Sequence, residues 1–219
     1  MSDIFREIDE DLRRERMGAL WKKYGNWVVT AALLIVAGTA GWRGWEYWRT
    51  REAEAAGARY EKALELARDS KDAEAEQAFS AVVAQAPGGY RILARMRGAA
   101  EIAKRDPEAG VAAWRAIAGD AGVGGVIQDL ARIRIGYLIV DKASYADLAK
   151  ETESLTASGS AYRNAARELL ALSALKSGDT TNAAKWLDQI VADREAPQGM
   201  RQRAEAFLGF VAGGQVRTQ

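Results

Sequence analysis

The chain has 219 residues, 48% of them apolar, with three prolines and neither cysteine nor histidine. Without these two residue types, disulfides, thiol nucleophiles, imidazole bases and the usual zinc, haem and iron–sulfur ligand sets are excluded. The 31 Lys and Arg residues nearly balance the 30 Asp and Glu residues, so a net charge of +1 gives no overall basic field for nucleic acid. We therefore expect a helical protein with no cofactor, no metal and no nucleic-acid partner.

The first segment, residues 1–22, is a charged tail. Ile4, Phe5, Ile8 and Leu12 recur at roughly helical spacing, as in a short amphipathic helix. The tail is acidic at its start and basic toward its end, so its basic half suits anionic lipid headgroups and its acidic half suits a protein partner. The alternative is a solvated tail that only assists membrane insertion.

Residues 23–46 form the predicted transmembrane anchor. Between Lys23 and Arg43 the chain carries no charge, and at 1.5 Å per residue this stretch spans about 28 Å, close to the hydrocarbon thickness of a bilayer. Aromatic side chains gather at both of its ends, as expected for anchors in the two membrane interfaces. They are Trp21, Tyr24, Trp27, Trp42, Trp45, Tyr47 and Trp48. A buried core helix, the alternative, has no reason to carry aromatic residues at both ends, so membrane lipid is an expected partner.

A cleavable signal peptide competes with the anchor, because Gly38-Thr39-Ala40 resembles a small-residue cleavage site. The charged region before the apolar run is much longer than a usual n-region, and cleavage would separate the second aromatic cluster from the membrane. We therefore expect an uncleaved anchor. Lys and Arg residues are nearly equal in number on its two sides and do not decide its orientation. Because an N-terminal anchor usually exports a long domain that follows it, we expect residues 1–22 to be cytoplasmic.

Residues 47–219 show the pattern of a helical repeat domain. Strand signals are nearly absent, and breaks rich in Gly, Pro, Asp and Ser interrupt an apolar periodicity of three to four residues. A large apolar residue follows an Asp by seven or eight positions at Phe79, Trp114, Leu148 and Trp186, and the intervals between them are 35, 34 and 38 residues. This spacing is close to the tetratricopeptide period of about 34. We expect helix pairs at 50–86, 90–119, 123–156 and 161–194, and a capping helix at 197–212.

Small residues support the same repeat. Ala75 lies four positions before Phe79, where two helices must approach closely, and Gly110 lies four before Trp114. The last repeat departs from the pattern because Asn182 takes the small position. The predicted fold class is therefore all-α, with one transmembrane helix followed by a divergent tetratricopeptide-repeat-like α-solenoid; an irregular helical bundle is the alternative.

The first helices of successive pairs are expected to form a concave docking surface. The candidate partner-binding residues on them are Arg91, Arg95, Arg132, Arg134, Tyr137, Arg163 and Arg167. Arginines four positions apart share one helix face, which suits carboxylates or an extended acidic peptide. The alternative is a solvated row of arginines.

No catalytic motif stands out. The stretch Gly122-Val-Gly124-Gly125 has no strand before it and no Gly-Lys-Ser/Thr after it, so it is interpreted as a turn rather than a phosphate loop. Serines have no imidazole base beside them and no Gly-x-Ser-x-Gly elbow. We therefore do not expect an enzyme.

Three stretches of the first fifty residues resemble a known family. They are Ser2-Asp-Ile-Phe-Arg-Glu-Ile-Asp-Glu-Asp-Leu-Arg-Arg-Glu-Arg16, Leu20-Trp-Lys-Lys-Tyr-Gly25 and Gly41-Trp-Arg-Gly-Trp-Glu-Tyr-Trp48. In these residues, and in the order of its parts, the chain is similar to alphaproteobacterial members of the YfgM-like family. The resemblance implies a cell inner membrane protein with a periplasmic tetratricopeptide-like domain, working as an ancillary subunit of the SecYEG translocon and handing exported proteins toward periplasmic chaperones. It transfers no catalytic residues.

Two classes of function stay open at this point. The protein is either a chaperone-like scaffold that contacts exported proteins transiently, or a permanent structural subunit of another inner-membrane complex. Transient clients need an accessible concave groove, whereas a permanent subunit needs an extensive apolar face or a tightly packed membrane helix. Self-association into a homo-oligomer is compatible with either.

Overall fold

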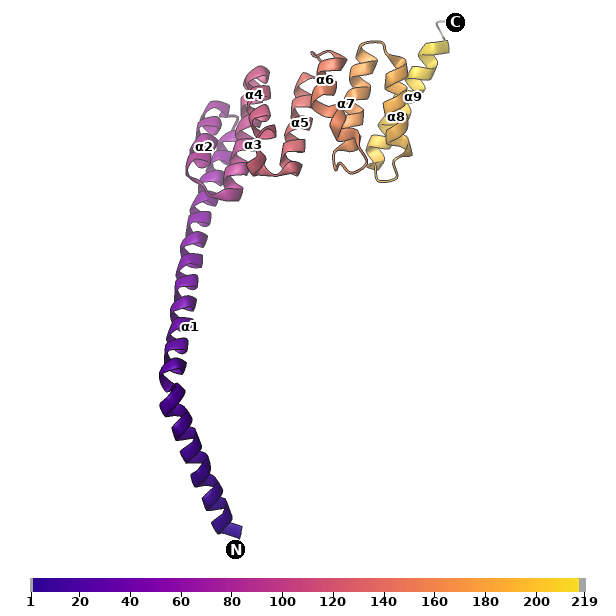
Figure 1. The fold of residues 1–219 in the computed structure, drawn as a ribbon. Coiled ribbons are helices and arrows are strands. Elements are labelled where there is room, and N and C mark those ends of the chain that lie inside the picture. The colour runs from indigo at the N-terminus through magenta and orange to yellow at the C-terminus, as the bar shows by residue number, and fades with distance from the viewer. Residues whose placement is uncertain (1, 217–219) are drawn as a thin grey trace. The chain divides into compact units, whose positions relative to one another are not determined.

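The computed structural model describes residues 2–216, and the side chains of residues 17, 18 and 20–213 among them. Two compact units divide the chain, residues 1–55 and residues 56–219. The described part is built from helices and contains no strand (Figure 1). The first helix, α1 (Ser2–Arg68), contributes residues to both units.

The second unit continues after α1 as a series of short helices. In order these are α2 (Asp72–Gln85), α3 (Gly88–Arg105), α4 (Pro107–Ala118), α5 (Gly125–Ile139), α6 (Tyr145–Thr152), α7 (Arg163–Lys176), α8 (Thr180–Ala192) and α9 (Gln198–Val216), with short 3-10 helices at Ala121–Val123 and Glu153–Thr156. The predicted pairs correspond to the end of α1 with α2, to α3 with α4, to α5 with α6 and to α7 with α8. Helix α9 takes the place of the predicted cap.

Side-chain caps explain where three of the described helices, α4, α6 and α8, begin. The Asp106 carboxylate accepts hydrogen bonds from the backbone N–H groups of Glu108 and Ala109, and Pro107 occupies the first turn of α4. Ser144 caps α6 and Asp179 caps α8 in the same way. Each cap satisfies N–H groups that have no partner inside the helix, so the breaks between helices are fixed locally.

Each of the helices α2 to α8 packs against the helix that follows it in the chain (Figure 1). Three hydrophobic clusters result, centred on Phe79, on Trp114 and on Leu169 with Trp186. Contacts between sequence neighbours are typical of repeat proteins, in which every hairpin buries its apolar face against the next.

The bulky positions of the predicted repeats are confirmed as core positions. Phe79, Trp114, Leu148 and Trp186 are all buried, on α2, α4, α6 and α8 respectively. The last repeat differs from its predicted pattern, because the fully buried small residue is Ala183. Asn182 is only partly buried and belongs to the helix cap, where its backbone N–H and side-chain amide donate to the Asp179 carboxylate.

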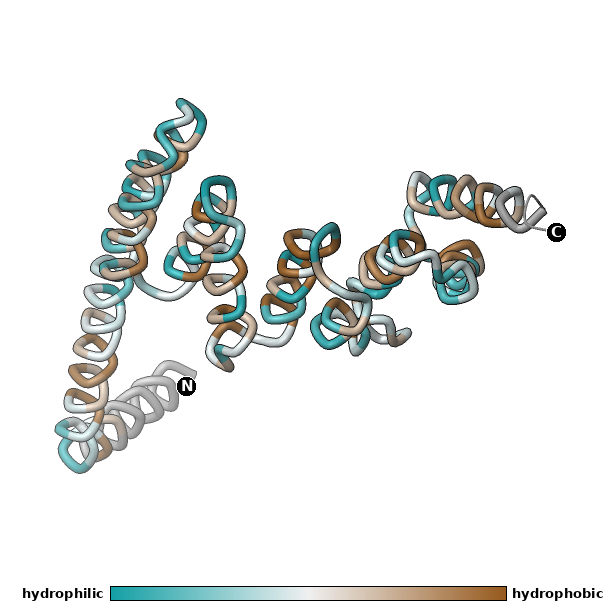
Figure 2. The backbone as a smooth tube through the Cα atoms, turned by 90° about the horizontal axis from the view of Figure 1, so that it is seen from above, coloured by the Kyte–Doolittle hydropathy of each residue, from teal (hydrophilic) through white to brown (hydrophobic). Residues whose placement is uncertain are grey.

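The described residues of the first unit all belong to α1. By length and composition, the helical stretch Leu20–Arg68 contains one window apolar enough to cross a membrane. Hydrophobic turns of α1 form a brown band between hydrophilic teal turns (Figure 2). The domain boundaries predicted after residues 22 and 46 fall inside α1, which continues through both. Residues 2–16 are helical, but their side chains lie outside the described residues, and so does the predicted amphipathic face of the tail.

Candidate functional site

A groove runs between α3 and α5, which both pack against α4. It consists of two hollows of about 390 and 320 Å³ that share Ala100, Trp114 and Arg134 in their walls. We call it the α3–α5 groove, and its lining residues are Tyr60, Leu93, Met96, Arg97, Ala100, Ala103, Lys104, Trp114, Leu130, Arg134, Tyr137 and Leu138. Two helices and the aromatic ring beneath them thus form one continuous recess.

Helical periodicity explains how so many residues reach the groove. The lining residues of α3 recur every three or four positions from Leu93 to Lys104, and those of α5 do so from Leu130 to Leu138, so each set occupies one helix face. Trp114 comes from α4, is 4% exposed, and forms the floor. The walls are mainly apolar, so the groove can accept apolar side chains.

The charges of the groove all have one sign. Its charged residues are Arg97, Lys104 and Arg134, and no Asp or Glu is among the lining residues. Arg97 and Arg134 are exposed and form no ion pair within the part of the chain whose side chains are described. Lys104 is different, because it pairs with Glu101 and lies 3.5 Å from Asp72. The hydrogen bond to Glu101 raises the pKa of Lys104. Arg97 and Arg134 are therefore available to pair with an acidic ligand.

Tyr137 adds a polar group at one end of the groove. Its side chain is 48% exposed. Desolvation raises the pKa of the Tyr137 phenol, and the negative charge of nearby Glu168 acts in the same direction. The phenol is therefore neutral at physiological pH and can both donate and accept a hydrogen bond. Glu168 itself is bound by Arg203 of α9, with Nη2 2.8 Å from the carboxylate.

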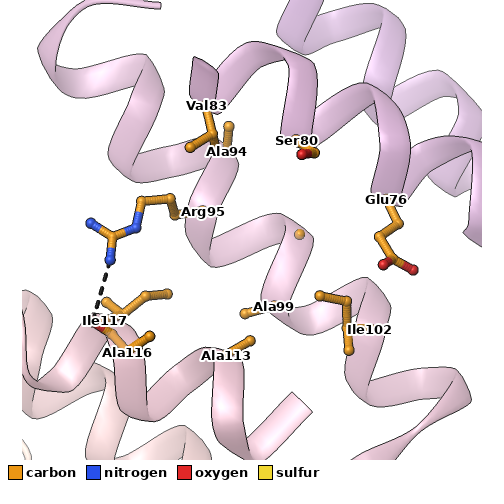
Figure 3. A pocket seen from close by; sticks show the side chains of 11 residues that line it. Glu76, Ser80, Val83, Ala94, Arg95, Ala99, Ile102, Ala113, Ala116 and Ile117 are labelled. Atoms are coloured by element: carbon orange, nitrogen blue, oxygen red, sulfur yellow. Dashed lines mark hydrogen bonds between the residues drawn. The ribbon is translucent and has the colours of Figure 1, made fainter. Parts of the chain in front are cut away.

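Another hollow, of about 300 Å³ and separate from the α3–α5 groove, lies between α2, α3 and α4 (Figure 3). Arg95 extends from α3 toward α4, where it ion-pairs with Asp120 and donates to the carbonyl oxygen of Ala116 at 3.3 Å. The hydrogen bonds from Arg95 and from the Gly122 backbone lower the pKa of Asp120. Glu76 is paired with Arg105 at 2.7 Å. Because protein partners already neutralise its charges, this hollow is less suited to a charged ligand than the α3–α5 groove.

The aromatic residues predicted for the membrane interfaces are all exposed along α1. Their exposed fractions range from 49% for Tyr24 to 76% for Trp27. Cations lie over several of the rings, with Lys23 Nζ 5.2 Å from the ring centre of Tyr24 and Arg49 Cζ 5.4 Å from that of Trp45. The placement of these side chains in membrane interfaces stays a prediction.

Comparison with known proteins identifies the repeat. A family model described as a tetratricopeptide repeat-like domain matches residues 19–158. The chain belongs to this family. No curated protein and no solved structure matches the chain. Tetratricopeptide repeat-like domains are typically non-catalytic modules that bind other proteins, which agrees with the expected protein-binding role.

The predicted partner-binding residues lie in different surroundings within the tetratricopeptide repeat-like domain. Arg134 and Tyr137 lie in the α3–α5 groove. Arg91 is exposed, and its Nε donates to the carbonyl oxygen of Ala86 at 3.1 Å. Arg132 lies 3.4 Å from Asp129, three residues earlier on α5. Partner contact by these residues stays a prediction.

The other three arginines differ from the expected open face, because they are engaged within the domain. Arg95 reaches α4, as described above. Arg163 and Arg167 have side chains only 14% and 11% exposed, and both bind the carboxylate of Asp193. Their spacing on one helix face was predicted, but that face meets the end of α8 instead of solvent.

Sequence reasoning missed several groove residues, among them Leu93, Arg97 and Leu130. For the residues of α3 the signal is the helical spacing, because Leu93, Arg97 and Lys104 share a helix face that Arg91 and Arg95 do not. Among the described residues no cluster of three or more acidic side chains has the arrangement of a metal site.

Proposed function

We propose that this chain is a single-pass protein of the bacterial inner membrane whose periplasmic tetratricopeptide repeat-like domain is a non-enzymatic scaffold for exported or envelope proteins. Residues 1–22 lie in the cytoplasm, residues 23–46 form the anchor and residues 47–219 are periplasmic. The resemblance to the YfgM-like family supports a finer role, as an ancillary subunit of the SecYEG translocon that passes clients toward periplasmic chaperones.

The exposure of the apolar stretch of α1 carries the membrane part of this proposal. Only 6% of its most apolar window is buried, and Leu33, Leu34 and Ile35 are each more than 60% exposed. A helix in the core of a water-soluble domain is covered by that domain. Apolar surface costs about 25 cal/mol per Å² in water, so a bilayer is the environment that suits these side chains.

The α3–α5 groove supports the scaffold part. It has an apolar floor, two arginines that form no ion pair among the described side chains, and a neutral tyrosine, which are groups that recognise polypeptide segments. The family has non-catalytic binding as its usual role. A scaffold that meets many clients needs such an accessible recess on a rigid array of helices.

Membrane location is tested on the full-length protein in bacterial cells. The protein is expected to stay in the membrane pellet after alkaline extraction, and a reporter active only outside the cytoplasm is expected to work when fused after Gln219. Edman sequencing of the mature protein is expected to give a start well before the apolar stretch. Recovery in the salt-washed soluble fraction, or a mature N-terminus near Gly41, contradicts the proposal.

Partner capture tests the scaffold function. A photoreactive amino acid is placed at Leu93 or Tyr137 in the groove, at Leu34 in the anchor, or at exposed Arg194 as a control. We expect many exported proteins at the two groove positions, translocon subunits at Leu34, and few products at Arg194. One fixed partner at Leu34, with nothing at the groove, indicates a permanent subunit of another complex instead. Capture of lipid and the protein itself alone, at every position, removes the basis of both functions.

A further inference from the structure

We infer that the α3–α5 groove recognises a short acidic segment of a partner protein that also carries apolar side chains. The inference rests on the proposed scaffold function and specifies the chemistry of its client. Carboxylates of the segment pair with Arg97 and Arg134, and apolar side chains enter the hollows over Trp114.

Charge complementarity favours an acidic occupant. Every charged residue in the groove wall is basic, and Arg97 and Arg134 approach it from opposite sides, on α3 and α5. An arginine with no carboxylate partner offers its planar guanidinium for two parallel hydrogen bonds to a carboxylate. The other cation, Lys104, already has Glu101 and Asp72 as partners, so the two arginines are expected to provide most of the selectivity.

The floor of the groove favours apolar side chains beside those carboxylates. Trp114 and Ala100 line both hollows, with Leu93, Met96 and Leu130 along the walls of one of them. Along α3 the lining extends from Leu93 to Lys104, which is about 16 Å at 1.5 Å per residue. An extended chain covers that length with about five residues. A segment that alternates apolar and acidic residues presents one kind to the floor and the other to the rim.

The same charges argue against two other occupants. A second copy that docked groove to groove would bring Arg97 and Arg134 close to the same arginines of its partner, and like charges across an interface are unfavourable. Nucleic acid is disfavoured because the chain has a net charge of only +1 and therefore no overall basic field.

Fluorescence anisotropy on the full-length protein in phosphatidylcholine nanodiscs tests the inference. The probe is a labelled decapeptide that alternates Leu or Phe with Asp or Glu; comparison peptides carry Lys, or Asn and Gln, in place of every acidic residue. We expect the acidic peptide to bind at least about tenfold more tightly than either comparison peptide, with affinity that falls as salt is added. Equal binding of all three peptides, or no binding of the acidic one, overturns the inference.

Variants locate the binding. The double change Arg97→Glu and Arg134→Glu is expected to lower the affinity for the acidic peptide at least about tenfold, and Leu93→Ser is expected to lower it several-fold. Arg194→Glu, at an exposed arginine outside the groove, is expected to leave the affinity unchanged. Far-UV circular dichroism checks that each variant is folded, and the milder double change to Gln replaces the Glu pair if it is not. Unchanged affinity in the folded double variant overturns the inference.

The outcome is distinguishable from failure of the proposed function. If exported proteins are captured at Leu93 in cells but the acidic peptide does not bind, the scaffold function stands and the inferred chemistry is wrong. If the peptide binds as expected but the protein is recovered in the soluble fraction, the groove chemistry stands and the membrane proposal is wrong.

Discussion

Arg163 of α7 binds both carboxylate oxygens of Asp193, with Nε 2.6 Å from one oxygen and Nη2 3.1 Å from the other. The side-chain amide of Asn164 donates to the same carboxylate at 3.0 Å, and Nη1 of Arg167 does so at 3.2 Å. Asp193 directly follows α8, so this cluster joins the start of one helix to the end of its neighbour. The two arginines that resembled a docking row therefore bind a carboxylate within the last helix hairpin.

Replacing Asp193 by Ala is expected to destabilise the repeat domain. The change leaves Arg163 and Arg167 largely shielded from water and without their shared carboxylate, which is unfavourable for a guanidinium. We expect the midpoint of thermal unfolding to fall by at least about 3 °C, measured by far-UV circular dichroism on the full chain in detergent. Asp188→Ala is the matched control, because Asp188 is exposed on α8 and forms no ion pair among the described side chains. Equal midpoints for the two variants would contradict a stabilising role for the cluster.

The same cluster predicts a loss of stability in acid. The hydrogen bond from Arg163, helped by the Glu195 backbone N–H and Asn164, holds the pKa of Asp193 well below its ordinary value of 3.8. In the unfolded chain Asp193 takes up a proton near that ordinary value, so acid favours the unfolded state. The stabilisation is complete above about pH 5 and is lost progressively below about pH 4.

The check is the difference in unfolding midpoint between neutral and acidic solution. Asp193→Asn removes the titrating group, so this variant is expected to lose less stability on acidification than the unmodified protein. If the unfolding midpoints of the two proteins fall in parallel as the pH is lowered, Asp193 does not contribute to acid sensitivity.

The repeat architecture was predictable because its determinants are local in sequence. Asp106 and Asp179 cap helices within three residues of themselves, and bulky residues such as Phe79 recur at a fixed period. Such features need no knowledge of which helices meet. The displacement of the small position from Asn182 to Ala183 was not predictable, because it depends on which face of α8 packs against the neighbouring helices α7 and α9.

The groove was only partly predictable because its composition depends on contacts between distant residues. Arg95 and Arg97 are two positions apart and differ by roughly 200° around α3, so one meets Asp120 and the other faces the groove. Arg163 finds its partner Asp193 thirty residues later. The sequence shows that these arginines exist but does not show which carboxylates reach them.

At Gly110 the helices α3 and α4 approach so closely that a larger side chain there is expected to destabilise the fold. A Cβ atom at this position lies 2.4 Å from Ala103 Cβ and 2.6 Å from its Cα, so backbone must move to accommodate it. Gly110→Ala is expected to lower the free energy of unfolding by about 1–3 kcal/mol, measured by urea denaturation. The control is Gly209→Ala on α9, where nothing lies within 4 Å of the new atom. There alanine is expected to stabilise the helix by about 0.5–1 kcal/mol. Similar effects at both sites would show that α3 and α4 do not approach closely.

A hydrogen bond between α6 and α8 provides a further prediction. The indole Nε1–H of Trp186 donates to the hydroxyl oxygen of Tyr145 at 2.9 Å, and Trp186 is buried. Tyr145→Phe leaves this indole N–H without an acceptor, so we expect a loss of about 1–3 kcal/mol in the free energy of unfolding. Tyr162→Phe tests the loss of a hydroxyl from the edge of the same hydrophobic cluster. No hydrogen bond to the Tyr162 hydroxyl is present among the described residues, so a change below about 0.5 kcal/mol is expected there.

The exposed apolar surface of α1 leads to the prediction that most directly separates a membrane anchor from a solvated helix. Leu34 is 68% exposed near the middle of the apolar stretch. An arginine near the centre of a transmembrane helix costs about 2.5–3.5 kcal/mol on insertion. Leu34→Arg should therefore reduce the fraction of protein that resists alkaline extraction from membranes. Val126→Arg makes the equivalent change at an exposed position of α5 and should leave that fraction unchanged. If α1 is solvated, arginine replaces an exposed leucine at no cost and the two variants partition alike.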